Sequence, residues 1–192
     1  TANGKGIVAS GVNLTVEGNS ITVTDTGLAD SYAISVSDST GVNINDNTVN
    51  YTGKTNGTFV NNALYVADSA VESIDGNTFD IAIPSVDVAW PEISPGNYVR
   101  LPVSEGIVLK NDTGLVFANN IINLNATDII TESGYDTIYA VDVDSDNAVV
   151  DNNIIAAKGA DYIYGVIVSG NNFTVSNNAI QAESDNYANG ID

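Results

Sequence analysis

The chain has 192 residues, of which 24 are acidic and only 5 are Lys or Arg, so its formal net charge is −19. It contains no Cys, His or Met, which excludes Cys or His nucleophiles, haem, iron–sulfur clusters and ordinary zinc sites. Five scattered cations cannot follow a phosphate backbone, so we expect no nucleic-acid partner. No apolar run approaches the roughly 20 residues of a membrane-spanning helix, so we expect no membrane insertion by this chain.

A short alternating segment, opened by Gly or Ala, recurs along the chain. The segments are 6–8, 33–36, 63–66, 106–109, 140–143, 165–168 and 190–192. Alternation of apolar and polar residues with a period of two predicts a β-strand whose first apolar residue faces inward.

A recurring spacing links six of these segments to an Asn. Each Asn has the same sequence context: a turn residue, Asn, any residue and an apolar residue. The asparagines are Asn19, Asn47, Asn77, Asn120, Asn153 and Asn178, each 12 or 13 residues after the first inward apolar residue. The preceding residue is always Gly, Asp or Asn, the types that best tolerate a left-handed backbone. Each site is therefore predicted to be a tight bend between two strands.

Six units with this spacing and with period-two strands predict a β-solenoid. We expect an all-β chain, a single-stranded right-handed parallel β-helix of about six to seven turns, with residues 1–192 forming one domain. An inward stack of Ile, Val and Leu would fill it. The asparagines would form an external ladder in which each amide bonds the bend and the next Asn; a row of ligand-binding groups is the alternative.

Two insertions, 80–104 and 123–137, interrupt the repeats. The first holds all four prolines, the only Trp (Trp90) and the only Arg (Arg100), with Tyr98 between them. Because Trp, Tyr and Arg dominate binding hot spots, one interpretation is that Trp90, Tyr98 and Arg100 bind a ligand. The other is a Pro-stiffened flap that covers an edge and buries Trp90. The second insertion is polar and acidic and gives no comparable signal.

One acidic cluster, Asp142, Asp144 and Asp146, stands out. Asp142 and Asp144 are predicted to point outward from one strand, about 7 Å apart. The pattern is similar to the start of an Asp-x-Asp-x-Asp calcium loop, but Asn147 and Asn153 replace its Gly and its bidentate Glu. A solvated acidic face is the simpler interpretation, and a Ca²⁺ site or a catalytic carboxylate pair is the alternative. The equivalent outward positions of the other repeats add no supporting group, and no cofactor is required.

The unit from Tyr164 to Ile180 resembles the repeats of large adhesin-like surface proteins of methanogenic archaea. Those repeats are in turn similar to the right-handed β-helix repeats of the pectin-lyase-like superfamily. The resemblance implies an extracellular, cell-surface protein that attaches to other cells or to glycans. No catalytic motif of the enzymatic members matches here, so no catalytic residue is assigned. Because the chain begins and ends inside repeats, we expect it to be a piece of a longer protein.

Three functions follow from these observations. The favoured one is a non-catalytic surface module that binds glycans or the surface of a partner cell. The second is a polysaccharide-active enzyme, a lyase or glycoside hydrolase, with Asp142 and Asp144 as its carboxylates. The third is a structural stalk that holds other domains away from the cell.

Overall fold

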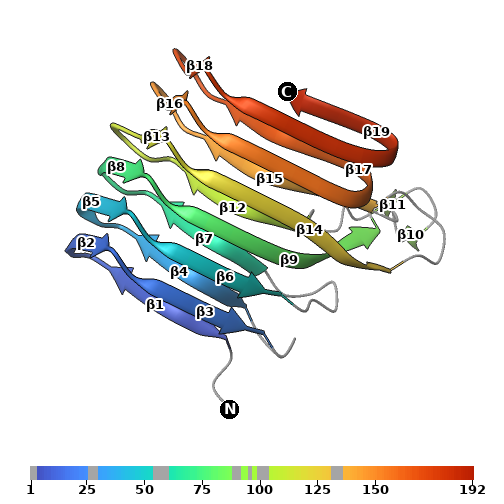
Figure 1. Ribbon diagram of the computed structural model, residues 1–192, viewed down its shortest axis with the longest axis horizontal. Coiled ribbons are helices and arrows are strands. Elements are labelled where there is room, and N and C mark those ends of the chain that lie inside the picture. The colour runs from blue at the N-terminus through green and yellow to red at the C-terminus, as the bar shows by residue number, and fades with distance from the viewer. Residues whose placement is uncertain are drawn as a thin grey trace.

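The computed structural model describes residues 4–25, 30–53, 61–87, 92–94, 97–98, 104–130 and 136–192. Side chains are described for these residues except 84–87, 92–94, 97–98, 127–130, 136 and 185. Over this part of the chain the regular structure is entirely β, and no helix is present. The prediction of an all-β chain is therefore confirmed (Figure 1).

A six-stranded sheet of parallel strands forms one wall of the molecule. Its strands are β2 (Asn13–Glu17), β5 (Thr40–Asn45), β8 (Val71–Asp75), β13 (Val116–Ala118), β16 (Val149–Asp151) and β18 (Thr174–Ser176).

An eleven-stranded sheet forms the remaining walls, which we call the back arm and the front arm. The back arm contains β1 (Lys5–Ser10), β4 (Ser31–Ser37), β7 (Asn61–Ala67), β12 (Ser104–Lys110) and β15 (Asp136–Asp144). The front arm, which faces the viewer in Figure 1, contains β3 (Ser20–Thr24), β6 (Thr48–Thr52), β9 (Thr78–Asp87) and β14 (Ile121–Ile130). Two long strands, β17 (Ile154–Ser169) and β19 (Ala179–Ile191), run through both arms, and β10 (Glu92–Ser94) pairs with β11 (Asn97–Tyr98) separately.

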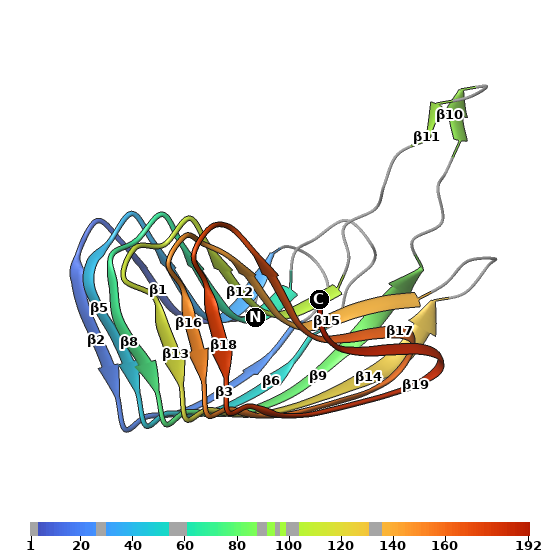
Figure 2. The same ribbon diagram turned by 90° about the horizontal axis from the view of Figure 1, so that it is seen from above.

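Each circuit of the chain adds one parallel strand to each wall. From β1 to β9, for example, every strand pairs with the third strand before or after it. Seen down the stack in Figure 2, the walls nearly close around one apolar interior. An antiparallel contact between β15 and β9 helps to close the side opposite the six-stranded sheet.

The residues predicted to form one inward stack do lie in register on the back arm. The row runs through Ile7, Ile34, Leu64, Ile107, Val141, Val166 and Ile191. The five middle members are fully buried, whereas Ile191 at the end of the stack is 50% exposed. Burial of such rows from all three walls supplies the apolar driving force of the fold.

The predicted bends are present, because the residue before each of the six asparagines has a positive φ between 54° and 66°. The asparagines form a ladder. Asn77, for example, donates its amide hydrogens to the Ile44 carbonyl (2.7 Å) and to Asn120 Oδ1 (2.9 Å). The expectation of an external ladder is wrong, because the four middle asparagines are at most 1% exposed. Bonds to main-chain carbonyls of the preceding circuit require the amides to point inward.

A second polar row lies at the corner between the back arm and the six-stranded sheet. It consists of Ser39, Ser69, Asp112 and Ser145, each of which accepts a main-chain N–H from the preceding circuit. All four residues are buried. Asp112 is thus a carboxyl group in a slot that otherwise holds a serine hydroxyl.

The two predicted insertions begin inside regular structure. Asp80 and Asn123 are strand residues of β9 and β14, and they pair with each other in the front arm.

The described residues contain no helix that is long and apolar enough to cross a membrane.

Candidate functional site

The outer face of the back arm carries a row of tyrosines, which we call the tyrosine face. It is defined by Tyr32, Tyr65, Tyr139 and Tyr164, all half-buried. The Tyr32 and Tyr65 rings lie 5.6 Å apart, and the Tyr139 and Tyr164 rings meet edge to face at 5.2 Å. Tyr187 extends the row, 5.9 Å from Tyr164. These centroid distances are typical of favourable aromatic pairs.

A lysine with two carboxyl groups lies between the two tyrosine pairs. Lys110 Nζ is 3.3 Å from Asp142 Oδ2 and 3.7 Å from Glu105 Oε1. Both carboxyl side chains are largely buried, at 12% and 18% exposure. Strand register explains the grouping: Asp142 on β15 pairs with Val108 on β12, so Lys110, two residues further along β12, lies diagonally beside it.

The cluster has unusual protonation. Burial raises the pKa of Glu105 to about 7, with Lys110 opposing the rise and the negative charge of Asp142 adding to it. Burial works against the charge of Lys110, but the two carboxyl groups outweigh it and raise the lysine pKa. Burial of the cluster therefore favours the protonated form of Glu105, while the neighbouring carboxyl groups favour the charged form of Lys110.

This arrangement suits polyhydroxylated ligands. Tyrosine rings offer flat apolar surfaces that also end in a hydroxyl group, and the cluster offers charged donors and acceptors between them. Burial and the charge of Asp30 raise the pKa of Tyr32 to about 12, so its hydroxyl remains a donor over the physiological range.

The three predicted metal ligands have different partners. Asp142 contacts Lys110, Asp144 accepts a hydrogen bond from the Ser169 hydroxyl (2.9 Å), and Asp146 accepts one from the Asn171 main chain (2.6 Å). Within the described part of the chain, no group of three or more acidic side chains is arranged to hold a metal ion. Calcium binding by this segment stays a prediction.

The predicted ligand-binding residues of the first insertion give no geometry to discuss. Trp90 and Arg100 lie outside the described residues, and for Tyr98 only the backbone, in β11, is described.

Glu105, Lys110 and three of the tyrosines were missed from the sequence because only the outward column of Asp142 was compared between repeats. Two other columns carried the signal. Register pairs Glu105 with Tyr139 and Tyr139 with Tyr164, and it pairs Lys110 with Asp144. Alignment of every outward column on the repeat would have placed these residues on one face.

Comparison of the chain with protein-family models, curated proteins and solved structures finds no match. The functional argument therefore depends on the residues of this chain alone.

Proposed function

We propose that the chain is a non-catalytic, extracellular module of a cell-surface protein, and that it binds a glycan, free or on a partner cell, through the tyrosine face. The carrying observation is the combination on one face of paired tyrosine rings with the cluster of Glu105, Lys110 and Asp142. Sugar rings have apolar C–H faces and a polar rim, and this surface offers partners for both.

The architecture proposed with this function is a right-handed single-stranded parallel β-helix of the adhesin-like kind. Pairing of each strand with the strand one circuit away supports it, as does the buried Asn ladder. Such a stack is a rigid support, on which side chains from neighbouring circuits stand about 4.8 Å apart. That spacing lets one extended ligand contact several circuits at once.

One observation favours a second candidate, a polysaccharide-active enzyme. Glu105 has a pKa near neutrality while its neighbour Asp142 is paired with Lys110, and a proton donor beside a carboxylate is the usual equipment for glycosidic cleavage or lyase chemistry. In this alternative Glu105 would protonate and Asp142 would act as base or nucleophile.

The two candidates are separated by experiment. A glycan array probed with the chain identifies the ligand, and a screen on polyuronates and wall glycans tests turnover. The proposed function predicts saturable binding without release of reducing ends or unsaturated products. Turnover that Asp142→Asn and Glu105→Gln both abolish would replace it with the enzyme. Absence of binding to every glycan and cell surface tried would leave the structural stalk.

A further inference from the structure

The tyrosine face already holds two ammonium groups of the chain itself. Lys5 Nζ lies over the Tyr32 ring, 5.8 Å from its centroid, a distance at which the negative face of an aromatic ring attracts a cation. Lys110 Nζ lies beside Asp142 and Glu105. Two kinds of environment on this face, a ring surface and a carboxyl group, are therefore suited to an ammonium group.

Carboxyl groups outnumber ammonium groups around Lys110. Asp142 and Glu105 lie 3.3 Å and 3.7 Å from its Nζ, and Asp144 pairs with it in register across β15 and β12. The shorter contact is to Asp142, so Lys110 leaves Glu105 less tightly paired. The net charge of −19 adds an attractive field for cations from the rest of the chain. The cluster thus has capacity for a further positive charge.

Strand register places this capacity beside aromatic rings. Glu105 on β12 pairs with Tyr139 on β15, and Tyr139 pairs with Tyr164 on β17, so these residues follow one another at about 4.8 Å across the strands. The planes of the two rings are nearly perpendicular, at 87°. Aromatic rings at an angle to each other are the arrangement with which proteins surround ammonium ligands.

An ammonium group beside Glu105 would also favour its carboxylate form. Burial raises the pKa of Glu105, and the charge of Lys110 opposes this rise. A ligand ammonium acts in the same direction as Lys110. The described titratable groups of the cluster are Lys110 on the same strand, Asp142 on β15 and Tyr65 on β7. The ligand thus stabilises the charged form of the group that binds it.

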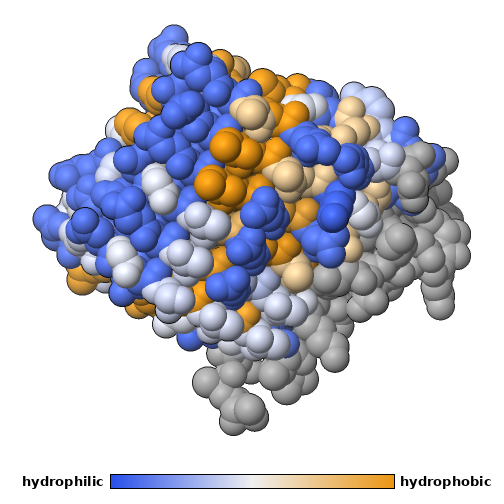
Figure 3. Space-filling view, in the orientation of Figure 1, coloured by the Kyte–Doolittle hydropathy of each residue, from blue (hydrophilic) through white to orange (hydrophobic). Residues whose placement is uncertain are grey.

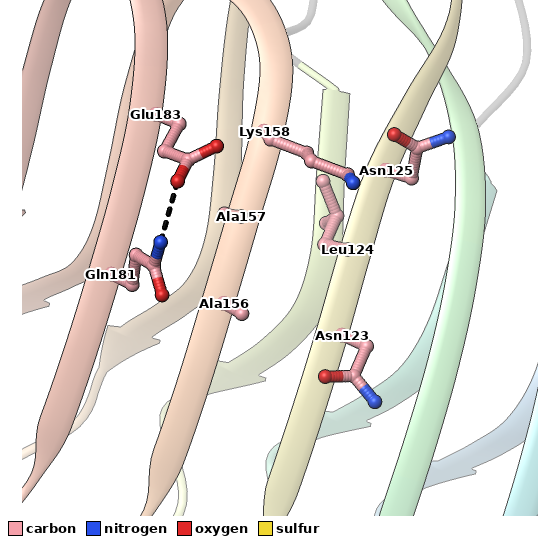
Figure 4. Close-up of a pocket in the computed structure, with 8 residues that line it drawn as sticks. All are labelled: Asn123, Leu124, Asn125, Ala156, Ala157, Lys158, Gln181 and Glu183. Carbon is pink, nitrogen blue, oxygen red and sulfur yellow. Dashed lines mark hydrogen bonds between the residues drawn. The ribbon is translucent and has the colours of Figure 1, made fainter.

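A hollow on the outer face of the front arm is less suited to a cation. It has a volume of about 390 Å³ and is lined by residues of β14, β17 and β19. In Figure 3, which shows this side of the molecule, apolar surface lies beside hydrophilic groups. The lining includes Lys158, and Glu183, which pairs with Lys158 in register, accepts a hydrogen bond from Gln181 (Figure 4). Lys158 repels an ammonium group there, which leaves the tyrosine face as the better site.

We infer that the glycan bound by the tyrosine face carries a free amine, as in a glucosamine oligomer. Its ammonium group lies against the Tyr139 and Tyr164 rings on the side of Glu105, and its sugar ring stacks on a neighbouring tyrosine. The inference rests on the proposed function, because it uses the same face and names the class of sugar that binds there.

The test is calorimetric titration of the chain at pH 7 and low salt with chitotriose, in which every amine is free. The comparison is triacetylchitotriose, which has the same sugar rings and no charge. We expect chitotriose to bind at least about tenfold more tightly, because acetylation removes both the cation–π contact and the charge-assisted hydrogen bond. The affinity for chitotriose should also fall with added salt, whereas that for the acetylated trimer should not.

Glu105→Gln keeps the shape of the side chain and removes its charge, so we expect it to abolish most of the difference between the two trimers. The matched control is Glu17→Gln, which removes the same charge from an exposed position on β2 of the six-stranded sheet and should preserve the difference. An unchanged melting temperature shows that each variant is folded.

Two results would overturn the inference: chitotriose that binds no more tightly than the acetylated trimer, or the same difference between the trimers in Glu105→Gln as in Glu17→Gln. Binding of the acetylated trimer alone, weakened by Tyr139→Ala, would remove the ammonium site and leave the proposed function standing. Failure of both trimers to bind would also remove the inference, whereas the proposed function fails only if no glycan or cell surface binds.

Discussion

Replacement of Asp112 by Asn should stabilise the protein at neutral pH and above, and not at acidic pH. Asp112 is 2% exposed, its Oδ1 accepts the Ser69 N–H (3.0 Å), and its Oδ2 is buried without a hydrogen-bond partner. Burial raises its pKa from the ordinary 3.8 to about 7; the Ser69 N–H opposes this rise and the charge of Asp68 adds to it.

The direction in which the free energy of unfolding changes with pH follows from the protons bound by the folded and unfolded chains. Between pH 4 and pH 7 the unfolded chain has lost this proton while the folded chain keeps it, so the free energy of unfolding falls as pH rises. At about 1.36 kcal/mol for each pH unit, the full shift is worth about 4 kcal/mol, which we take as an upper bound. The Asn variant lacks this penalty, because its side-chain amide is uncharged at every pH. We expect it to gain about 2–4 kcal/mol at pH 8 and less than about 1 kcal/mol at pH 4.

Urea unfolding of both proteins from pH 4 to pH 8 measures the effect. The matched control is Asp38→Asn, which removes one exposed negative charge next to Ser39 of the same corner row and should leave the pH dependence nearly as in the wild type. Parallel curves for wild type and Asp112→Asn would refute the reasoning, because they would mean that the buried carboxyl group titrates normally.

Three further predictions concern the ladder, the close contact of the arms and the charge. Asn120→Ala removes buried bonds to the Ile74 carbonyl (2.9 Å) and to Asn153 (3.1 Å) and should cost about 3–5 kcal/mol in urea unfolding. Asn19→Ala, at the exposed end of the ladder, should cost about 1 kcal/mol, and equal losses would contradict the burial argument. Gly106→Ala places a Cβ 2.6 Å from Leu124 Cδ1 and 2.9 Å from the Ala140 carbonyl and should cost about 1–3 kcal/mol by the same assay; an unchanged stability would show that the arms separate easily. At a net charge of −19, the melting temperature should rise with salt. It should rise further with Ca²⁺ than with Mg²⁺ at equal ionic strength if Asp142, Asp144 and Asp146 bind calcium, whereas equal effects would indicate screening alone.

Much of the backbone arrangement could be predicted because the repeat records it directly. The residue before each ladder Asn must adopt a left-handed conformation, and only Gly, Asp or Asn occurs there. The distance from the first inward residue of a repeat to the following Asn, 12 residues from Ile7 and 13 from Ile34, predicted the register of the inward row. Two features that do not recur with the same residue types in each repeat were not predicted. The corner row of Ser39, Ser69 and Asp112 changes residue type, and the continuous run of β17 through both arms leaves no turn residue to mark a boundary.

The candidate site was predicted only in part, for a physical reason. Asp142 stood out because it lies in a dense acidic segment, but its partners Lys110 and Glu105 come from the preceding circuit, more than 30 residues earlier. A diagonal contact across two strands depends on register and on side-chain length, and a comparison of single columns does not contain it. The depression lined by Asn123, Ala156 and Gln181 on the outer face of the front arm was missed, because an Ala between two amides leaves a gap only after the strands are stacked.

The central claim, that the tyrosine face binds a glycan, is tested most directly by one titration. The glycan that binds best on the array is titrated into the wild-type chain and into Tyr139→Ala/Tyr164→Ala, with Phe173→Ala as a control that removes an exposed aromatic ring elsewhere. Truncation of an aromatic anchor in a binding site commonly costs more than about 1 kcal/mol, and about 1.4 kcal/mol is a tenfold change in affinity. The double variant should therefore bind at least about tenfold more weakly, and the control should bind like the wild type. Equal affinity of all three folded proteins for that glycan would contradict the account.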